Sequence, residues 1–179
     1  MDILAITGSL RAGSYNTMLA KELMAQAPAP LHITLTGIDG IPIYNGDEDG
    51  PDKPAAVLAL AEKIRAAKGL IIVAPEYNYS IPGGLKNALD WVSRLPNQPF
   101  KDKRTAIAGA AMGPLGTGRM QYHLRQVLQF LETQVMPKPE IFLGAAHTKF
   151  DAAGKLTDQP TADVLGAWLG AFKDWVARG

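Results

Sequence analysis

The sequence contains no cysteine. It can therefore form no disulfide, iron–sulfur cluster, thiolate metal site or cysteine nucleophile. No apolar run approaches the roughly 20 residues that a membrane-spanning helix needs. Residues 1–7 lack the basic segment that opens a signal peptide and instead resemble a first strand. We therefore expect a cytoplasmic protein that has no membrane partner.

The sequence also lacks an excess of charge of either sign. Its formal net charge is +1, and 20% of its residues are charged. This balance disfavours nucleic acid as a partner, because proteins that bind it through bulk charge are strongly basic. Hydrophobic residues make up 47% of the 179 residues, which is typical of a globular chain long enough to bury a full core. We expect one domain spanning residues 1–179.

Apolar runs that suit buried strands alternate with segments of helical periodicity along the chain. Such alternation predicts an α/β fold, a doubly wound parallel sheet of five strands with helices on both faces. The expected strands are 2–7, 31–37, 69–74, 104–109 and 141–143, and the expected helices are about 15–27, 55–67, 84–94, 119–135 and 161–177.

Three connections from a strand to the next helix are rich in Gly, Ser or Asn. They are the first loop (residues 8–16), the second loop (75–84) and the third loop (109–118). The carboxyl ends of parallel strands meet at one edge of a sheet, and open α/β sheets bind ligands there. The sequence therefore predicts a ligand site where the three loops converge.

The first loop has the features of a phosphate site. It leads directly into a helix N-terminus, where free backbone N–H groups and the helix dipole favour an anion, and Arg11 adds a positive charge. Its spacing matches neither the dinucleotide-binding glycine pattern nor the P-loop. The alternative is a simple helix cap at Ser14 or Asn16 beside a solvated Arg11.

The second loop follows the apolar strand 69–74 and precedes a helix. Tyr77, Asn78, Tyr79 and Ser80 lie together in it. Their rings and polar groups suit a flat polar ligand.

Two motifs carry a resemblance to a known family. The first is Gly8-Ser9-Leu10-Arg11 followed by Ser14 and Asn16. The second runs from Pro75-Glu76-Tyr77-Asn78 through Pro82-Gly83 and Leu85-Lys86-Asn87 to Asp90-Trp91 and Ser93-Arg94. Together they resemble the NADPH-dependent FMN reductase family, and within it the chain is most similar to bacterial soluble quinone and chromate reductases. The resemblance covers nearly the whole chain, including residues 121–126.

The resemblance implies a flavodoxin-like fold with strand order 2-1-3-4-5 and bound FMN, reduced by NADPH or NADH. Backbone N–H groups of residues 76–79 would bond the edge of the flavin. Such reductases commonly form dimers or tetramers. The implied site has three parts: the ribityl phosphate on Ser9, Arg11, Ser14, Asn16 and Thr17; the isoalloxazine against Pro75, Glu76, Tyr77, Asn78 and Tyr79; and the opposite side closed by Ala111, Met112 and Gly113.

No residue has to act as catalyst on this view, because FMN carries the hydride chemistry. Glu76 is open to two interpretations, a proton-transfer group or a carboxylate that hydrogen-bonds nearby backbone. Lys86 could meet an NADPH phosphate or form a salt bridge. His32, His123 and His147 lack the spacing of metal ligands, so we expect no metal site.

Three functions of different classes remain open. The first is an NAD(P)H oxidoreductase that reduces quinones and other small-molecule acceptors, such as chromate, azo compounds, ferric chelates or free flavin. The second is a flavodoxin-type electron carrier, although such carriers are usually strongly acidic. The third is a non-redox module that binds a nucleotide or sugar phosphate.

Overall fold

The computed structural model describes residues 1–178, in which strands and helices alternate as expected. The strands are β1 (Asp2–Thr7), β2 (His32–Thr36), β3 (Gly69–Val73), β4 (Arg104–Ala110), β5 (Gln134–Val135) and β6 (Ile141–Leu143). The helices are α1 (Tyr15–Ala25), α2 (Ala55–Ala66), α3 (Gly83–Ser93), α4 (Gly118–Phe130) and α5 (Gln159–Ala177).

All strand pairs are parallel, in the order β2-β1-β3-β4-β5, with β6 also paired to β4. The predicted flavodoxin-like order 2-1-3-4-5 is therefore confirmed. The central strand β3 is buried at each of its five residues, which explains its continuous apolar sequence.

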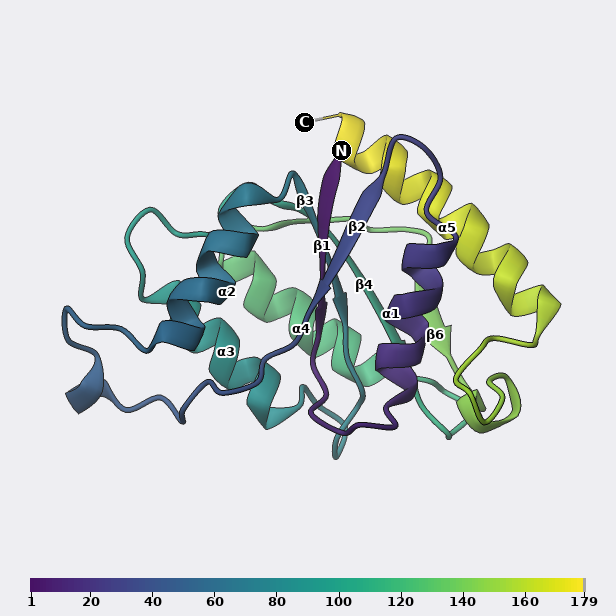
Figure 1. Cartoon of the computed structure of the whole chain (residues 1–179), viewed down its shortest axis with the longest axis horizontal. Helices are drawn as coiled ribbons and strands as arrows, with labels where there is room; N and C mark the ends of the chain where they lie inside the picture. The colour runs from purple at the N-terminus through teal and green to yellow at the C-terminus, as the bar shows by residue number, and fades with distance from the viewer. Residues whose placement is uncertain (179) are drawn as a thin grey trace.

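Helices cover both faces of the sheet. In Figure 1, α1 and α5 lie on one side, and α2, α3 and α4 lie on the other. Two separate apolar cores result: one joins the sheet to α1 and α5, and one joins it to the other three helices. The amphipathic pattern of α2 shows the cause, since Val57, Leu60, Ala61 and Ile64 recur at helical spacing and are all buried. Within residues 1–178, no helix is both long and apolar enough to cross a bilayer.

The fourth helix is shorter than the sequence predicts, and this corrects the expected range of 119–135. It ends at Phe130 because Glu132 adopts a left-handed backbone (φ 57°), and the Thr133 N–H then bonds the Leu128 carbonyl. The chain continues as β5, which pairs with the start of β4, while β6 pairs with its end. Two short strands thus share the fifth position, where we expected only one.

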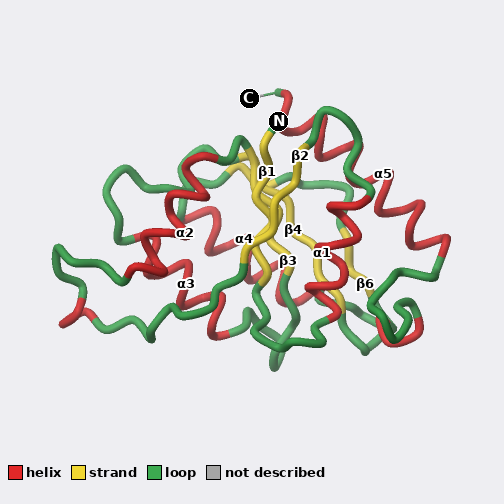
Figure 2. The backbone as a smooth tube through the Cα atoms, in the orientation of Figure 1, coloured by secondary structure: helices red, strands yellow, loops and turns green. Residues whose placement is uncertain are grey.

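The three loops leave the same edge of the sheet. Thr7 pairs with Val73, and Val73 pairs with Ala108, so β1, β3 and β4 end side by side. Figure 2 shows these connections gathered at the lower edge, beneath the strands. The predicted convergence of the three loops is therefore confirmed.

Candidate functional site

The first loop forms a tight turn that opens α1. Ser14 is the N-cap residue, and its Oγ accepts from the Asn16 N–H (3.2 Å). The Ser14 N–H donates to the Arg11 carbonyl, and Ser9 Oγ accepts from the Arg11 N–H (3.3 Å). The helix cap that we considered as an alternative is therefore present. It also leaves the exposed Arg11 guanidinium beside the helix N-terminus, 5.6 Å from the ring of Tyr15.

A cavity of about 390 Å³ lies beside this turn. Ser9, Arg11 and Thr17 line it, together with the end of β2. Three of the five residues expected at the phosphate thus face one hollow. Ser14 is buried in the cap, and both polar side-chain atoms of Asn16 bond Ala110 rather than facing the hollow.

The second loop contains a two-residue hairpin. The Tyr77 and Ser80 backbones bond each other in both directions (3.1 and 3.0 Å), and Asn78 and Tyr79 between them have φ values of 48° and 69°. Positive φ at both central positions is the mark of a type I′ turn. The hairpin leaves Tyr77 49% exposed and Tyr79 66% exposed. Two aromatic side chains therefore stand at the edge where the ligand is expected.

Glu76 is fixed to the start of α4. Its side chain is only 8% exposed, Oε1 accepts from Arg119 Nε (2.7 Å) and Oε2 accepts from the Met120 N–H (3.1 Å). The Arg119 guanidinium lies 3.7 Å from the centre of the Tyr79 ring. The structure thus matches the interpretation of Glu76 as a carboxylate that hydrogen-bonds nearby backbone. Arg119 was missed in the sequence, because its partners lie about 40 residues away.

The third loop is held from its far side by β6 and the turn that follows. The Ala111 N–H donates to the Leu143 carbonyl (2.9 Å), and the Ala145 N–H donates to the Gly113 carbonyl (3.2 Å). These bonds fix the backbone but leave Met112 62% exposed. Ala111, Met112 and Gly113 therefore lie where they could close a site formed by the other two loops.

The residues present fit a flavin nucleotide. Within residues 1–178, the N–H groups of Leu10, Ala12 and Gly13 in the first loop donate to no protein acceptor, and neither do those of Glu76, Asn78 and Tyr79 in the second. Such donors suit a phosphate at one end and the polar edge of a ring system at the other. The N–H of Tyr77, also expected to meet the flavin, is instead engaged in the hairpin. The same three loops carry exposed apolar or aromatic side chains, namely Leu10, Tyr77, Tyr79, Met112 and Leu115.

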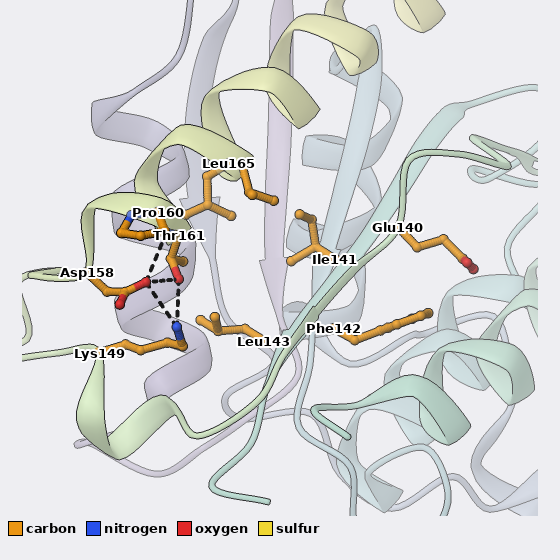
Figure 3. A pocket seen from close by; sticks show the side chains of 10 residues that line it. Glu140, Ile141, Phe142, Leu143, Lys149, Asp158, Pro160, Thr161 and Leu165 are labelled. Atoms are coloured by element: carbon orange, nitrogen blue, oxygen red, sulfur yellow. Dashed lines mark hydrogen bonds and ion pairs between the residues drawn. The ribbon is translucent and has the colours of Figure 1, made fainter. Parts of the chain in front are cut away.

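A second cavity, of about 410 Å³, lies between β6 and the start of α5 (Figure 3). Its charged groups already have partners: Lys149 Nζ donates to Asp158 Oδ2 (3.0 Å) and to Thr161 Oγ1 (2.9 Å), and Glu140 pairs with Arg125 (3.5 Å). None of the residues expected at the cofactor lines it. This cavity therefore gives no support to a cofactor site away from the three loops.

Lys86 and His123 each contact a neighbouring side chain. Lys86 Nζ contacts both carboxylate oxygens of Asp90, one turn further along α3, as the salt-bridge interpretation of Lys86 requires. His123 Nδ1 lies 3.0 Å from Ser80 Oγ. Among residues 1–178, no group of three or more His, Asp or Glu side chains is arranged to hold a metal ion.

A parallel sheet of this order has the flavodoxin-like fold, and its phosphate-type loop after β1 and aromatic loop after β3 lie at the edge where proteins of this fold bind ligands. The model of the NADPH-dependent FMN reductase family matches residues 1–148. The chain therefore belongs to the NADPH-dependent FMN reductase family, and the resemblance predicted from the two motifs is confirmed. At the level of the family, the predicted enzyme class and the FMN cofactor are confirmed too.

Individual relatives agree with this assignment. The chain is 47% identical over 176 residues to an NAD(P)H-dependent FMN reductase of Pseudomonas aeruginosa, covering 98% of this chain and 95% of that protein. It is 48% identical over 181 residues to a quinone reductase of Escherichia coli K12, covering 99% and 96%. Among solved structures, the flavoenzyme NAD(P)H:(acceptor) oxidoreductase FerB of Paracoccus denitrificans superposes with a TM-score of 0.90 at 34% identity, covering 99% and 97%.

Proposed function

We propose that the protein is an FMN-dependent NAD(P)H oxidoreductase that reduces quinones, with residues 1–179 as its single FMN-binding domain. The observation that carries this proposal is the convergence of three loops at the carboxyl edge of β1, β3 and β4. These loops bring an anion-binding turn, exposed aromatic rings and free backbone donors to one place. The family assignment and the names of the relatives support the same activity.

Each loop has a distinct task on this proposal. The turn at Ser9 and Arg11, with Thr17 beside it, binds the phosphate of FMN. The second loop places the N–H groups of Glu76, Asn78 and Tyr79 against the polar edge of the isoalloxazine. The third loop, at Ala111, Met112 and Gly113, closes the other side. The remaining predicted contacts, Ser14, Asn16, Pro75 and Tyr77, lie within the same loops.

FMN supplies the redox chemistry when bound, taking two electrons from NADPH or NADH and passing them to the acceptor. The protein then has to bind, orient and shield the cofactor, and it needs no nucleophile of its own. The surroundings of Glu76 agree, because its carboxylate is occupied by Arg119 and by the N–H of Met120. Apolar side chains around the loops, among them Leu10 and Met112, form a surface suited to flat acceptors such as quinones.

The finer points of the proposal concern acceptors and assembly. Chromate, azo compounds, ferric chelates and free flavin would react at the same exposed site, because a reduced flavin gives electrons to many oxidants. Dimers or tetramers and a cytoplasmic location stay predictions. A flavodoxin-type electron carrier is the second candidate, but such carriers are usually strongly acidic, and the net charge of +1 argues against this function.

The absorption spectrum of the purified protein tests the proposal. We expect flavin bands that bleach on anaerobic addition of NADPH or NADH and return when a quinone is added. Bands that respond to neither nucleotide would instead support the electron carrier. A protein that stays colourless after incubation with FMN would contradict both redox functions.

A further inference from the structure

The side chain of Asn16 is almost fully buried, with only 3% of the residue exposed. Its Nδ2 donates to the Ala110 carbonyl (3.0 Å), and the Ala110 N–H donates to its Oδ1 (2.8 Å). Both ends of the amide therefore bond one residue that lies 94 positions further along the chain. No part of this side chain faces the hollow beside Arg11.

The sheet explains why Ala110 needs such a partner. β3 and β4 pair as far as Val73 and Ala108, and the Ala74 N–H still donates to the Ala108 carbonyl (3.2 Å). β3 then turns away at Pro75, which has no N–H to give. The buried N–H and carbonyl of Ala110 would have no strand partner on that side, and unpaired buried backbone groups are costly.

We propose that Asn16 is a positioning residue for the cofactor site. If β3 continued in the sheet, the backbone of the second loop would bond the N–H and carbonyl of Ala110 on β4. The side-chain amide of Asn16 makes these two bonds instead. The N–H of Glu76 is thereby left without a protein acceptor. One side chain thus fixes the position of the first loop and of the end of β4 that leads into the third loop. It also fixes the point at which the second loop leaves the sheet. The role rests on the proposed function and differs from a direct phosphate contact.

Binding of two flavins to the apoprotein separates these roles. Riboflavin has the ring system of FMN but no phosphate. Asn16→Ala is expected to lower the affinity for both FMN and riboflavin by about tenfold, because losing the two buried hydrogen bonds to Ala110 moves all three loops. Arg11→Ala is the matched control and should lower the affinity for FMN while leaving the affinity for riboflavin unchanged.

Two results would overturn the proposal. If Asn16→Ala lowers the affinity for FMN but not for riboflavin, the side chain of Asn16 is a phosphate ligand. If the affinity for both flavins is unchanged, Asn16 has no role in the site. If wild-type protein binds neither flavin, the proposed function is contradicted. The role of Asn16 is then decided by hydrogen exchange in the apoprotein.

Amide hydrogen exchange, followed by NMR in the apoprotein, needs no flavin. We expect the Ala110 N–H of wild-type protein to exchange slowly. In Asn16→Ala, exchange should accelerate by about tenfold or more at Ala110 and in the first loop, while α5 keeps its protection. The wild-type measurement covers the case in which the variant fails to fold, since rapid exchange of Ala110 in wild-type protein would by itself refute the proposal.

Discussion

Glu76 Oε1 accepts a hydrogen bond from Arg119 Nε across 2.7 Å, and this pair joins the second loop to the first turn of α4. The same carboxylate accepts from the Met120 N–H, and the Arg119 guanidinium covers one face of the Tyr79 ring. The exposed tyrosine at the tip of the hairpin is therefore held by a network that begins at Glu76, three residues after the end of β3.

Glu76→Gln tests whether this carboxylate does more than hold the loop. Glutamine presents an N–H group to one of the two donors, so the free energy of unfolding should fall by about 1–3 kcal/mol. If Glu76 only holds the loop, turnover of NADPH with a quinone should fall by less than about tenfold. Steady-state kinetics at matched flavin loading measures this. A loss of roughly 100-fold or more in kcat would show a general acid or base.

Arg11→Ala tests the phosphate end of the site. If the guanidinium pairs with the phosphate, FMN affinity should fall by about 1.5–3 kcal/mol, as for a charge-assisted hydrogen bond. Titration of the apoprotein with FMN gives the value. Lys21→Ala removes an exposed positive charge from α1, the helix that follows the first loop, and serves as the control, since it should leave affinity unchanged. Equal affinity of wild type and Arg11→Ala would exclude Arg11 from the site.

Gly109→Ala, near the end of β4, and Gly113→Ala, in the third loop, form a matched pair. A Cβ at residue 109 would lie 2.2 Å from Thr117 Oγ1 and 2.4 Å from the Ala74 carbonyl oxygen, whereas a Cβ at residue 113 would meet no atom within 4 Å. We expect Gly109→Ala to lower the free energy of unfolding by about 1–3 kcal/mol through overpacking. Gly113→Ala should fold with unchanged stability in the apoprotein. Denaturant unfolding of both variants compares them, and equal stability would contradict the close approach at Gly109.

Asp49→Asn should change how stability depends on pH. Hydrogen bonds from Lys53 and then Arg94 hold the pKa of Asp49 well below its usual range. The carboxylate therefore contributes stability above its unfolded pKa of about 3.9, and that contribution is lost as pH falls toward the lower folded value. Wild type should melt at a higher temperature than Asp49→Asn at pH 7, and the gap should narrow below about pH 4.

Asp47→Asn is the control for that comparison, because Asp47 lies exposed in the same connection between β2 and α2. Thermal melts of the three proteins across the pH series should show the gap for Asp49→Asn alone. A gap of constant size from pH 7 to about pH 2.5 would contradict the role of the Asp49 charge.

Local pattern was sufficient to predict most of the fold. The apolar run 69–74 and the helical spacing of residues such as Val57 and Leu60 depend on near neighbours, which sequence displays directly. The end of α4 was misjudged because the segment 131–135 keeps apolar residues at helical spacing, while the pairing of β5 with Arg104 and Thr105 is a tertiary effect. Propensity alone does not reveal such pairing.

The candidate site divides in the same way. Ser9, Arg11 and the aromatic residues of the second loop were identified because they are close in sequence and lie where a ligand is expected. Asn16 was predicted to contact the phosphate, whereas its side chain bonds Ala110, a contact that spans 94 residues and gives no local signal. Arg119 is likewise recognisable only once α4 lies against the second loop.

The divided fifth position of the sheet also has a consequence for solubility. A long, regular edge strand offers a row of free backbone groups that another chain can extend, which is a route to aggregation. Here β5 has two residues and β6 has three, and residues 136–140 interrupt the row between them. This margin of the sheet is thus a poor template for strand addition, which should help the protein to stay dispersed at high concentration.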